Sequence, residues 1–333
     1  YMSNAIPFNS ENLKRLFSKD FLIVLLISFP SAIVADYFNI PLAWMIGPMI
    51  VVSITALNGV KIIMPKLALS GTLIILGLHI GHYIDQNLIN QMINWAWTSI
   101  IMFFYILVSI VIVSKYLQKF ANYKNKTSIF SAAPGALAPL MILAEYEKSD
   151  LSQVATSHLI RLIIIITFFP FIIINLIPTE AIEIEKFDYL GQNHLELLIL
   201  IITSIIIIII FDKIKVPATL LSGTLVASGI LQITDVASYK LPDETINFCL
   251  LILGASVGCR FIDKSIKEVA RNTFHSFVAT ILLVILGLLA AYIATFFVDN
   301  NFLTLVLSFC PGGIYEVAVI AIAFDLDPSF VSF

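Results

Sequence analysis

Apolar segments that could cross a membrane recur along the whole sequence and restrict the chain to a membrane fold. An α-helix needs about 20 apolar residues to cross a hydrocarbon core of roughly 30 Å. Charged residues make up only 12% of the 333 residues, against about 25% in soluble domains. We therefore predict an all-α polytopic membrane protein in a lipid bilayer. Its eleven apolar windows are 21–35, 37–57, 67–84, 90–114, 127–144, 153–178, 196–211, 216–233, 245–259, 273–298 and 300–324.

The charge balance and the cysteine content argue against several other classes of protein. Nineteen Lys and Arg residues nearly balance 22 Asp and Glu residues, so the chain has no basic surplus for a nucleic-acid surface. Cys249, Cys259 and Cys310 all lie in apolar windows, where neither a disulfide framework nor a thiolate metal site is expected. We expect no nucleic-acid partner, no metal and no cofactor.

Clusters of basic residues predict the orientation of the chain. One cluster, within residues 14–19, precedes the first window, and two others follow the fourth and ninth windows. Because such clusters remain on the cytoplasmic side, we predict that residues 1–20 form a cytoplasmic N-terminal segment. The acidic segment 179–195 is predicted as an external loop. Both predictions hold together only if the window 127–144 makes no net crossing.

Glycine and proline motifs recur at an offset of about 177 residues and predict a duplicated chain. Loops after equivalent windows carry opposite charge bias, which predicts inverted-topology repeats, an arrangement typical of secondary transporters with a midplane site. The first membrane repeat is predicted at 21–178 and the second at 196–333. The matched motifs are Gly77-x-x-x-Gly81 with Gly254-x-x-x-Gly258, Pro134-Gly135 with Pro311-Gly312, and Asp150 with Asp327.

The second repeat is expected to lack its last helix. At the same offset, the counterpart of the window 153–178 would lie beyond Phe333. Truncation of a longer chain is the favoured explanation, and a naturally shorter second repeat is the alternative.

Several strings resemble the bacterial AbrB (ammonia-monooxygenase-like) family of duplicated membrane proteins. The resemblance implies a location in the bacterial inner membrane and a fold similar to the sodium/proton antiporter and bile-acid symporter superfamily. Its labels also imply two other activities, regulation of gene expression and a monooxygenase reaction. The strings are IPLAWMIGPMI at 40–50, LGLHIGHYI at 76–84, APGALAPLMILA at 133–144, HLIRL at 158–162 and CPGGIYEVAVIAIAFDLDP at 310–328.

The histidines argue against the monooxygenase interpretation. Such an enzyme needs several His, Asp or Glu side chains that converge on copper or iron. The chain has five histidines, and only His79 and His82 have a spacing, i and i+3, that could make half a site. We therefore expect that the protein is not an enzyme.

Glu316 is the strongest candidate for binding an ion or a proton. It lies five residues after Pro311 in an otherwise apolar window. An ionised carboxylate in a membrane costs several kcal/mol unless it faces a cavity or a cation, so such a residue often holds a proton. The alternative is a carboxylate that reaches water at the tip of a short re-entrant segment.

Proline and glycine pairs predict two interrupted helices, because proline lacks an N–H donor and glycine tolerates unwound backbone. The free helix ends could bind a solute or an ion at the midplane, and kinks used only for packing are the alternative. Pro30, Pro41, Pro48 and Pro139 are also expected to interrupt their windows. The predicted substrate- or ion-binding residues are Glu316, Pro311, Gly312, Gly313, Pro134, Gly135 and His79.

Four further polar residues are predicted to lie behind the binding residues: Asp150, His158, Arg161 and Asp327. His158 and Arg161 share a helix face. Arg161 either pairs with Asp150, binds a substrate carboxylate or, as we favour, snorkels to the membrane interface. Asp150 and Asp327 also suit the N-cap position of a helix.

The sequence thus predicts a secondary transporter of a small solute, with a midplane site at two interrupted helices. A membrane-associated regulator of gene expression and a metal-dependent monooxygenase are the alternatives. A homo-oligomer is compatible with the sequence.

Overall fold

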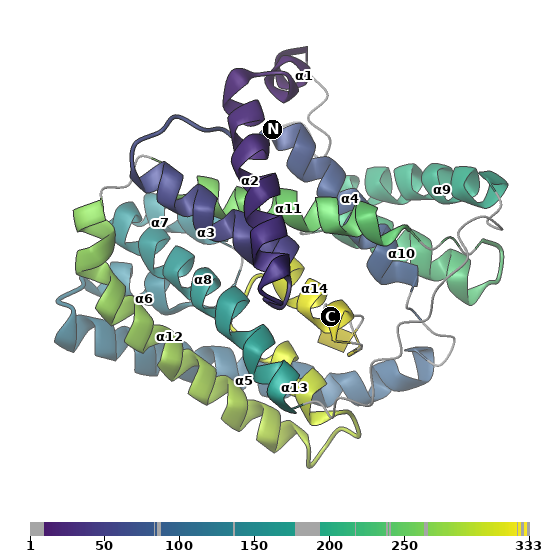
Figure 1. Ribbon diagram of the computed structural model, residues 1–333. Helices are drawn as coiled ribbons and strands as arrows, with labels where there is room; N and C mark the ends of the chain where they lie inside the picture. Colours follow the sequence, from purple (N-terminus) through teal and green to yellow (C-terminus); the bar gives the residue numbers. More distant parts are fainter. Residues whose placement is uncertain are drawn as a thin grey trace. The chain divides into compact units, whose positions relative to one another are not determined.

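A computed structural model of the chain describes residues 10–82, 84, 88–135, 137–176, 194–216, 218–237, 239, 241–262, 266–324, 326–327 and 330–331. Within these residues the regular structure is entirely α-helical (Figure 1). The chain divides into two compact units, each made of two separate stretches of sequence. Unit 1 comprises residues 1–88 and 179–263, and unit 2 comprises residues 89–178 and 264–333.

The helices of unit 1 are mostly short and apolar, and two of them reach 19 residues or more. One small core of this unit joins Leu78, Leu200 and Leu231, which lie on three different helices. The helices of unit 1 are α1 (Ser10–Leu16), α2 (Lys19–Tyr37), α3 (Ala43–Leu57), α4 (Lys66–His82), α9 (His194–Lys213), α10 (Thr219–Ile233) and α11 (Asp243–Cys259).

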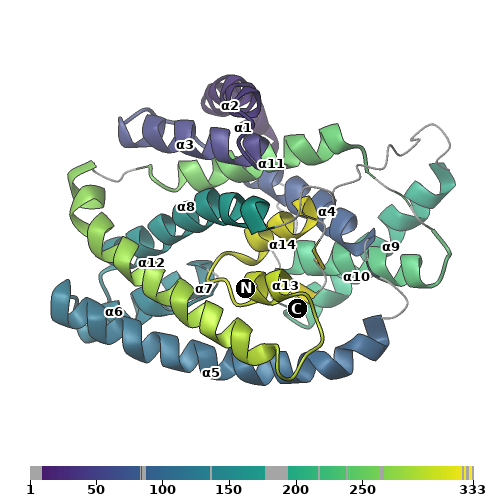
Figure 2. The ribbon, with the colours of Figure 1, turned by 60° about the horizontal axis from the view of Figure 1, so that its bottom comes forward.

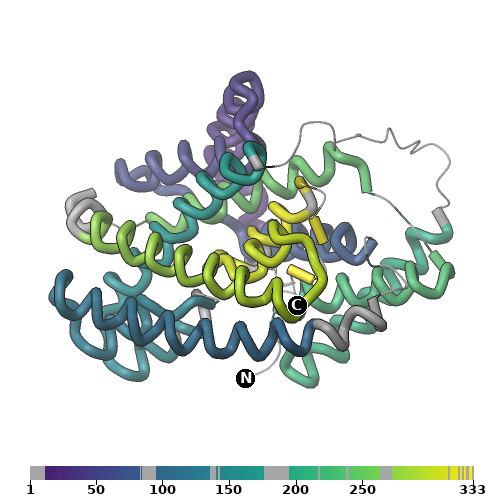
Figure 3. Tube along the Cα trace, turned by 90° about the horizontal axis from the view of Figure 1, so that it is seen from below, coloured from purple at the N-terminus to yellow at the C-terminus, as the bar shows by residue number. Residues whose placement is uncertain are grey.

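The helices of unit 2 include three long ones and four short ones. Its α5 and α12 run side by side in Figures 2 and 3, and their shared core includes Val113, Leu117 and Leu283. The helices are α5 (Leu88–Phe120), α6 (Asn125–Ala132), α7 (Leu137–Tyr146), α8 (Leu151–Leu176), α12 (Ile266–Ala294), α13 (Phe302–Ser308) and α14 (Ile314–Ala323).

Some of the predicted apolar windows form helices that are candidate membrane spans. Five stretches of the described chain are long and apolar enough to cross a bilayer. The windows 127–144 and 300–324 instead form two short helices each, as the Pro-Gly pairs predict. The five stretches are Asn12–Tyr37, Trp95–Phe120, Leu151–Asn175, Leu195–Lys213 and Asn272–Ala294.

Not every proline interrupts its helix as expected. Pro30 lies inside α2 and Pro48 inside α3, and both helices continue past them. Pro139 lies in the first turn of α7, where a missing N–H costs no helical hydrogen bond. An interior proline removes one hydrogen bond, and a helix can retain its course when no glycine follows to accommodate an unwound backbone. The expectation was therefore wrong for Pro30, Pro48 and Pro139.

Glycines let two pairs of helices in unit 1 approach each other closely. On α4, a Cβ added to Gly77 would overlap Thr224 Oγ1 and lie 2.6 Å from the carbonyl oxygen of Leu221, both on α10. On α11, a Cβ added to Gly254 would overlap the carbonyl oxygen of Met45 on α3. Small residues at such positions allow backbones to touch in membrane proteins. Helix α4 thus packs on α10, and α11 packs on α3.

Candidate functional site at two interrupted helices

The first interruption separates α6 from α7 in unit 2. Helix α6 ends at Ala132 and α7 begins at Leu137, with Pro134 and Gly135 between them. Gly135 has φ +147°, a conformation that residues with a side chain rarely adopt. The backbone therefore changes direction at the predicted Pro-Gly pair.

Two side chains of α8 supply hydrogen bonds that this interruption removes. In a continuous helix the carbonyl of Phe130 would accept from the N–H of residue 134, but Pro134 has none. His158 Nε2 instead donates to the oxygen of Phe130 at 2.9 Å. Arg161 Nη1 donates to the oxygen of Ala133 at 3.2 Å. The pair therefore caps the carboxyl end of α6 from a neighbouring helix.

His158 and Arg161 are also bonded to each other. Arg161 Nη2 donates to His158 Nδ1 at 2.6 Å. Because Nδ1 accepts this bond, Nε2 carries the ring proton, and the imidazole is neutral in this arrangement. His158 is 1% exposed and Arg161 is 3% exposed. The favoured sequence interpretation, in which Arg161 snorkels to the interface, is therefore wrong for this arrangement.

The second interruption separates α13 from α14. Helix α13 ends at Ser308 and α14 begins at Ile314, with Pro311, Gly312 and Gly313 between them. Phe309, at the start of this segment, is fully buried, and its ring meets that of Tyr105 edge-on at 5.9 Å between centroids.

Helix α8 contacts both interruptions within one helical turn. Arg161 bonds the end of α6, and Ile165, four residues later, lies beside Gly312, where a Cβ would be 3.4 Å from Ile165 Cγ2. One turn of helix is about 5.4 Å. The Cys310 thiol and the Tyr105 hydroxyl are within electrostatic range of the Arg161 guanidinium. Of the five candidate spans, α8 is also the most buried.

Glu316 lies in the first turn of α14 and is 2% exposed. Its carboxylate folds back over Gly313, where an added Cβ would overlap Oε2 and lie 2.8 Å from Cδ. A negative charge at this end of a helix is favoured by the helix dipole. Oε2 nevertheless has no hydrogen-bond partner among the described residues. Glu316 forms no ion pair with any described residue, unlike Glu147, which pairs with Lys126.

Asp150 caps a helix, and Asp327 accepts a backbone hydrogen bond of its own. Asp150 Oδ1 accepts from the N–H groups of Ser152 and Gln153 at the start of α8, at 3.0 and 3.1 Å. Asp327 Oδ1 accepts from the N–H of Phe330 at 3.0 Å. The N-cap interpretation is thus confirmed for Asp150. Arg161 bonds Ala133 and His158, so the alternative in which it pairs with Asp150 is not found in this arrangement.

His79 lies on α4 in unit 1, whereas the other predicted site residues all belong to unit 2. It is 5% exposed. Over the described parts of the chain, no three or more His, Cys, Asp or Glu side chains gather as metal ligands would.

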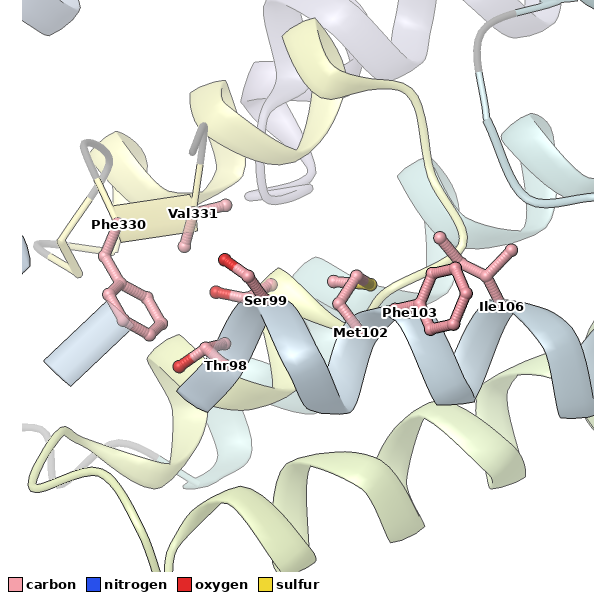
Figure 4. Close-up of a pocket in the computed structure, with 8 residues that line it drawn as sticks. Thr98, Ser99, Met102, Phe103, Ile106, Phe330 and Val331 are labelled. Carbon is pink, nitrogen blue, oxygen red and sulfur yellow. The ribbon is translucent and has the colours of Figure 1, made fainter. Parts of the chain in front are cut away.

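A pocket of about 300 Å³ lies in unit 2 beside the second interruption (Figure 4). One side is a face of α5, and Ser308, the last residue of α13, also borders it. The sequence did not indicate this pocket, because the adjacent pair Thr98 and Ser99 and the distant Ser308 form no recognisable motif in their apolar windows. The lining residues are Thr98, Ser99, Met102, Phe103, Ile106, Ser308, Phe330 and Val331.

The chain is similar to two bacterial proteins over most of its length. The "Putative regulator AbrB" of Escherichia coli strain K12 is 23% identical over 300 residues, which are 88% of this chain and 84% of that protein. The "Uncharacterized protein YhjN" of Bacillus subtilis strain 168 is 23% identical over 332 residues, covering 92% of this chain and 85% of that protein. No solved structure matches.

The family comparison extends over most of the sequence. The family described as "Transition state regulatory protein AbrB" matches residues 44–333, which include both interruptions and every predicted site residue. The chain is therefore a helical membrane protein that belongs to the AbrB family.

Proposed function

We propose that this protein is a secondary transporter of a small solute in the bacterial inner membrane. Its site would lie at the two interrupted helices of unit 2. The observation that carries the proposal is the burial of Arg161 and Glu316 beside these interruptions. Ionisable groups inside membrane helices are expensive and usually serve transport of ions or solutes. Interrupted helices supply free backbone groups for the same purpose.

The helix bounds support a duplicated chain. Helix α3 and helix α10 both have 15 residues, and α4 and α11 both have 17. Left-handed residues, Leu42 and Ala218, precede α3 and α10 with φ of 51° and 55°. The packing is reciprocal as well, because α4 contacts α10 while α11 contacts α3. We propose that the two repeats are 21–178 and 196–333.

The charge bias of equivalent loops supports inverted topology for these repeats, with the N-terminus in the cytoplasm. The proposed external loop, 179–195, lies largely outside the described residues, as does the first part of the cytoplasmic segment 1–20. We further propose that the fold is similar to the sodium/proton antiporter and bile-acid symporter superfamily. Each proposed repeat contains one interrupted helix, split into α6 and α7 in the first and into α13 and α14 in the second, and this supports the similarity.

Glu316 is proposed to couple transport to an ion or a proton. Proteoliposomes that contain the protein would be incubated with a bacterial metabolite extract, and solutes that accumulate would be identified by mass spectrometry. We expect at least one small solute to accumulate, and Glu316→Gln to lower its initial rate at least tenfold. Gly313→Ala should act in the same direction, because its Cβ would displace the carboxylate.

The matched control is Glu147→Gln, which removes an exposed carboxylate that pairs with Lys126. Its rate should stay within about twofold of the unmodified protein, because exposed ion pairs contribute little. Accumulation no greater than in empty liposomes would refute transport. Equal rates for Glu316→Gln and the unmodified protein would refute the coupling role of Glu316.

A further inference from the structure

The positive charge of Arg161 has no acidic partner among the residues that the structure describes. The side chain is 3% exposed on α8, within a stretch long and apolar enough to cross a membrane. Among the described residues, no carboxylate lies within 4.0 Å of its guanidinium. Buried charges in proteins are normally paired, because transfer of an isolated charge out of water is costly. A partner for this charge is therefore missing from the described chain.

The neighbours of Arg161 compensate only part of its charge. The carboxyl end of α6, which it contacts at the oxygen of Ala133, carries the equivalent of about half a negative charge. His158 is neutral in this arrangement, because its Nδ1 accepts from Arg161. Among the described residues, Tyr105 and Cys310 are also in electrostatic range, and neither side chain is charged at neutral pH. A substantial positive charge therefore remains.

One nitrogen of the guanidinium has no hydrogen-bond partner among the described residues. Nη1 and Nη2 bond Ala133 and His158, whereas Nε is buried without a hydrogen-bond partner among the described residues. An unpaired buried donor costs about 1–3 kcal/mol. The N–H groups of arginine match the oxygens of carboxylates and phosphates in geometry and in charge. The second interruption touches the same helix one turn away, because a Cβ added to Gly312 would lie 3.4 Å from Ile165 Cγ2, and its Cys310 is in electrostatic range of the guanidinium.

We propose that Arg161 binds a small oxyanion, a carboxylate or a phosphate, between α8 and the second interruption. The anion supplies the counter-charge and accepts from Nε. That this anion is also the transported substrate rests on the proposed function, whereas its binding is measured without transport. Helix α6 and His158 hold the guanidinium in place by its other two nitrogens.

Cys310 offers a way to build a counter-ion into the site without removing Arg161. Cys310→Asp places a carboxylate in electrostatic range of the guanidinium, and Cys310→Asn has the same shape without the charge. Thermal unfolding of the purified full chain in detergent would be followed by tryptophan fluorescence at constant ionic strength. The probes are acetate, succinate and inorganic phosphate, with acetamide as the uncharged control.

We expect at least one oxyanion to raise the melting temperature of the unmodified protein and of Cys310→Asn in a saturable way, while acetamide does not. A response to acetate or succinate alone indicates a carboxylate, and one to phosphate alone indicates a phosphate. Cys310→Asp should melt higher than Cys310→Asn without ligand and need at least tenfold more anion for half-saturation.

The proposal is wrong if no probe gives a saturable rise, or if the aspartate and asparagine variants respond alike. If Cys310→Asp does not fold, Arg161→Lys becomes the test of the proposal. Lysine keeps the positive charge but lacks the planar set of N–H donors of the guanidinium. This variant should need an anion concentration at least threefold higher for half-saturation, and an unchanged concentration overturns the proposal. If no oxyanion binds, solute can still accumulate in proteoliposomes, and Glu316→Gln can still lower its rate. The two proposals can therefore fail independently.

Discussion

Substituting His158 with leucine should lower the free energy of unfolding by about 2–5 kcal/mol. The change removes the donor to the oxygen of Phe130 and the acceptor of Arg161 Nη2, both buried. Each group left unpaired costs about 1–3 kcal/mol, and the cost is higher beside a charge. Equilibrium unfolding of the purified protein in mixed detergent micelles, monitored by helical circular dichroism, measures the loss.

The matched control for this change is His275→Leu. His275 Nδ1 and the Tyr116 hydroxyl form a single bond of 3.2 Å in a partly buried position. Its loss should cost at most about 1 kcal/mol. Combining His158→Leu with Pro134→Ala should recover part of the cost, because the alanine introduced there has an N–H that can donate to the oxygen of Phe130. If both histidine substitutions cost the same, the capping role of His158 is contradicted.

Gly254→Ala should lower the free energy of unfolding by about 1–3 kcal/mol, the usual cost of overpacking. The new Cβ would overlap the carbonyl oxygen of Met45 and lie 3.0 Å from its Cα. These are backbone atoms, so they can move only if α3 and α11 separate. The same unfolding measurement in micelles reports the change.

Gly71→Ala provides the opposite result as a control. Apart from the backbone of its own helix, no atom of the described residues lies within 4 Å of a Cβ added at Gly71, which is inside α4. Alanine has a higher helix propensity than glycine, so the protein should gain up to about 1 kcal/mol. A stabilising Gly254→Ala would show that α11 does not pack on α3 as described.

The interruptions could be predicted from the sequence, because each proline there is followed by glycine. Pro134-Gly135 and Pro311-Gly312-Gly313 end their helices, whereas Pro30 is followed by serine and Pro48 by methionine, and those helices continue. Proline removes one hydrogen bond, and the following glycine supplies the backbone freedom to turn away. A proline without a following glycine therefore does not predict where these helices end.

The polar contacts of the site were less predictable. The unusual position of Glu316 is evident from its apolar window, and the residue lies in the first turn of a helix shortly after Pro311. The environment of Arg161 is not evident from the sequence, because the sequence does not reveal which helices pack against α8 at this residue. Tyr105 and Cys310 carry no sequence signal, since single polar groups in apolar windows are common. Their proximity to Arg161 arises only from tertiary packing.

The accessibility of Cys310 tests the central claim most directly, because Cys310 lies in the second interruption near Arg161. In a variant with Cys249 and Cys259 changed to alanine, a membrane-impermeant thiol reagent would be applied to sealed vesicles of both orientations. A transporter that opens its site alternately to each side predicts that Cys310 reacts from both sides. Reaction from only one side, or from neither, would contradict a transport site at the interrupted helices.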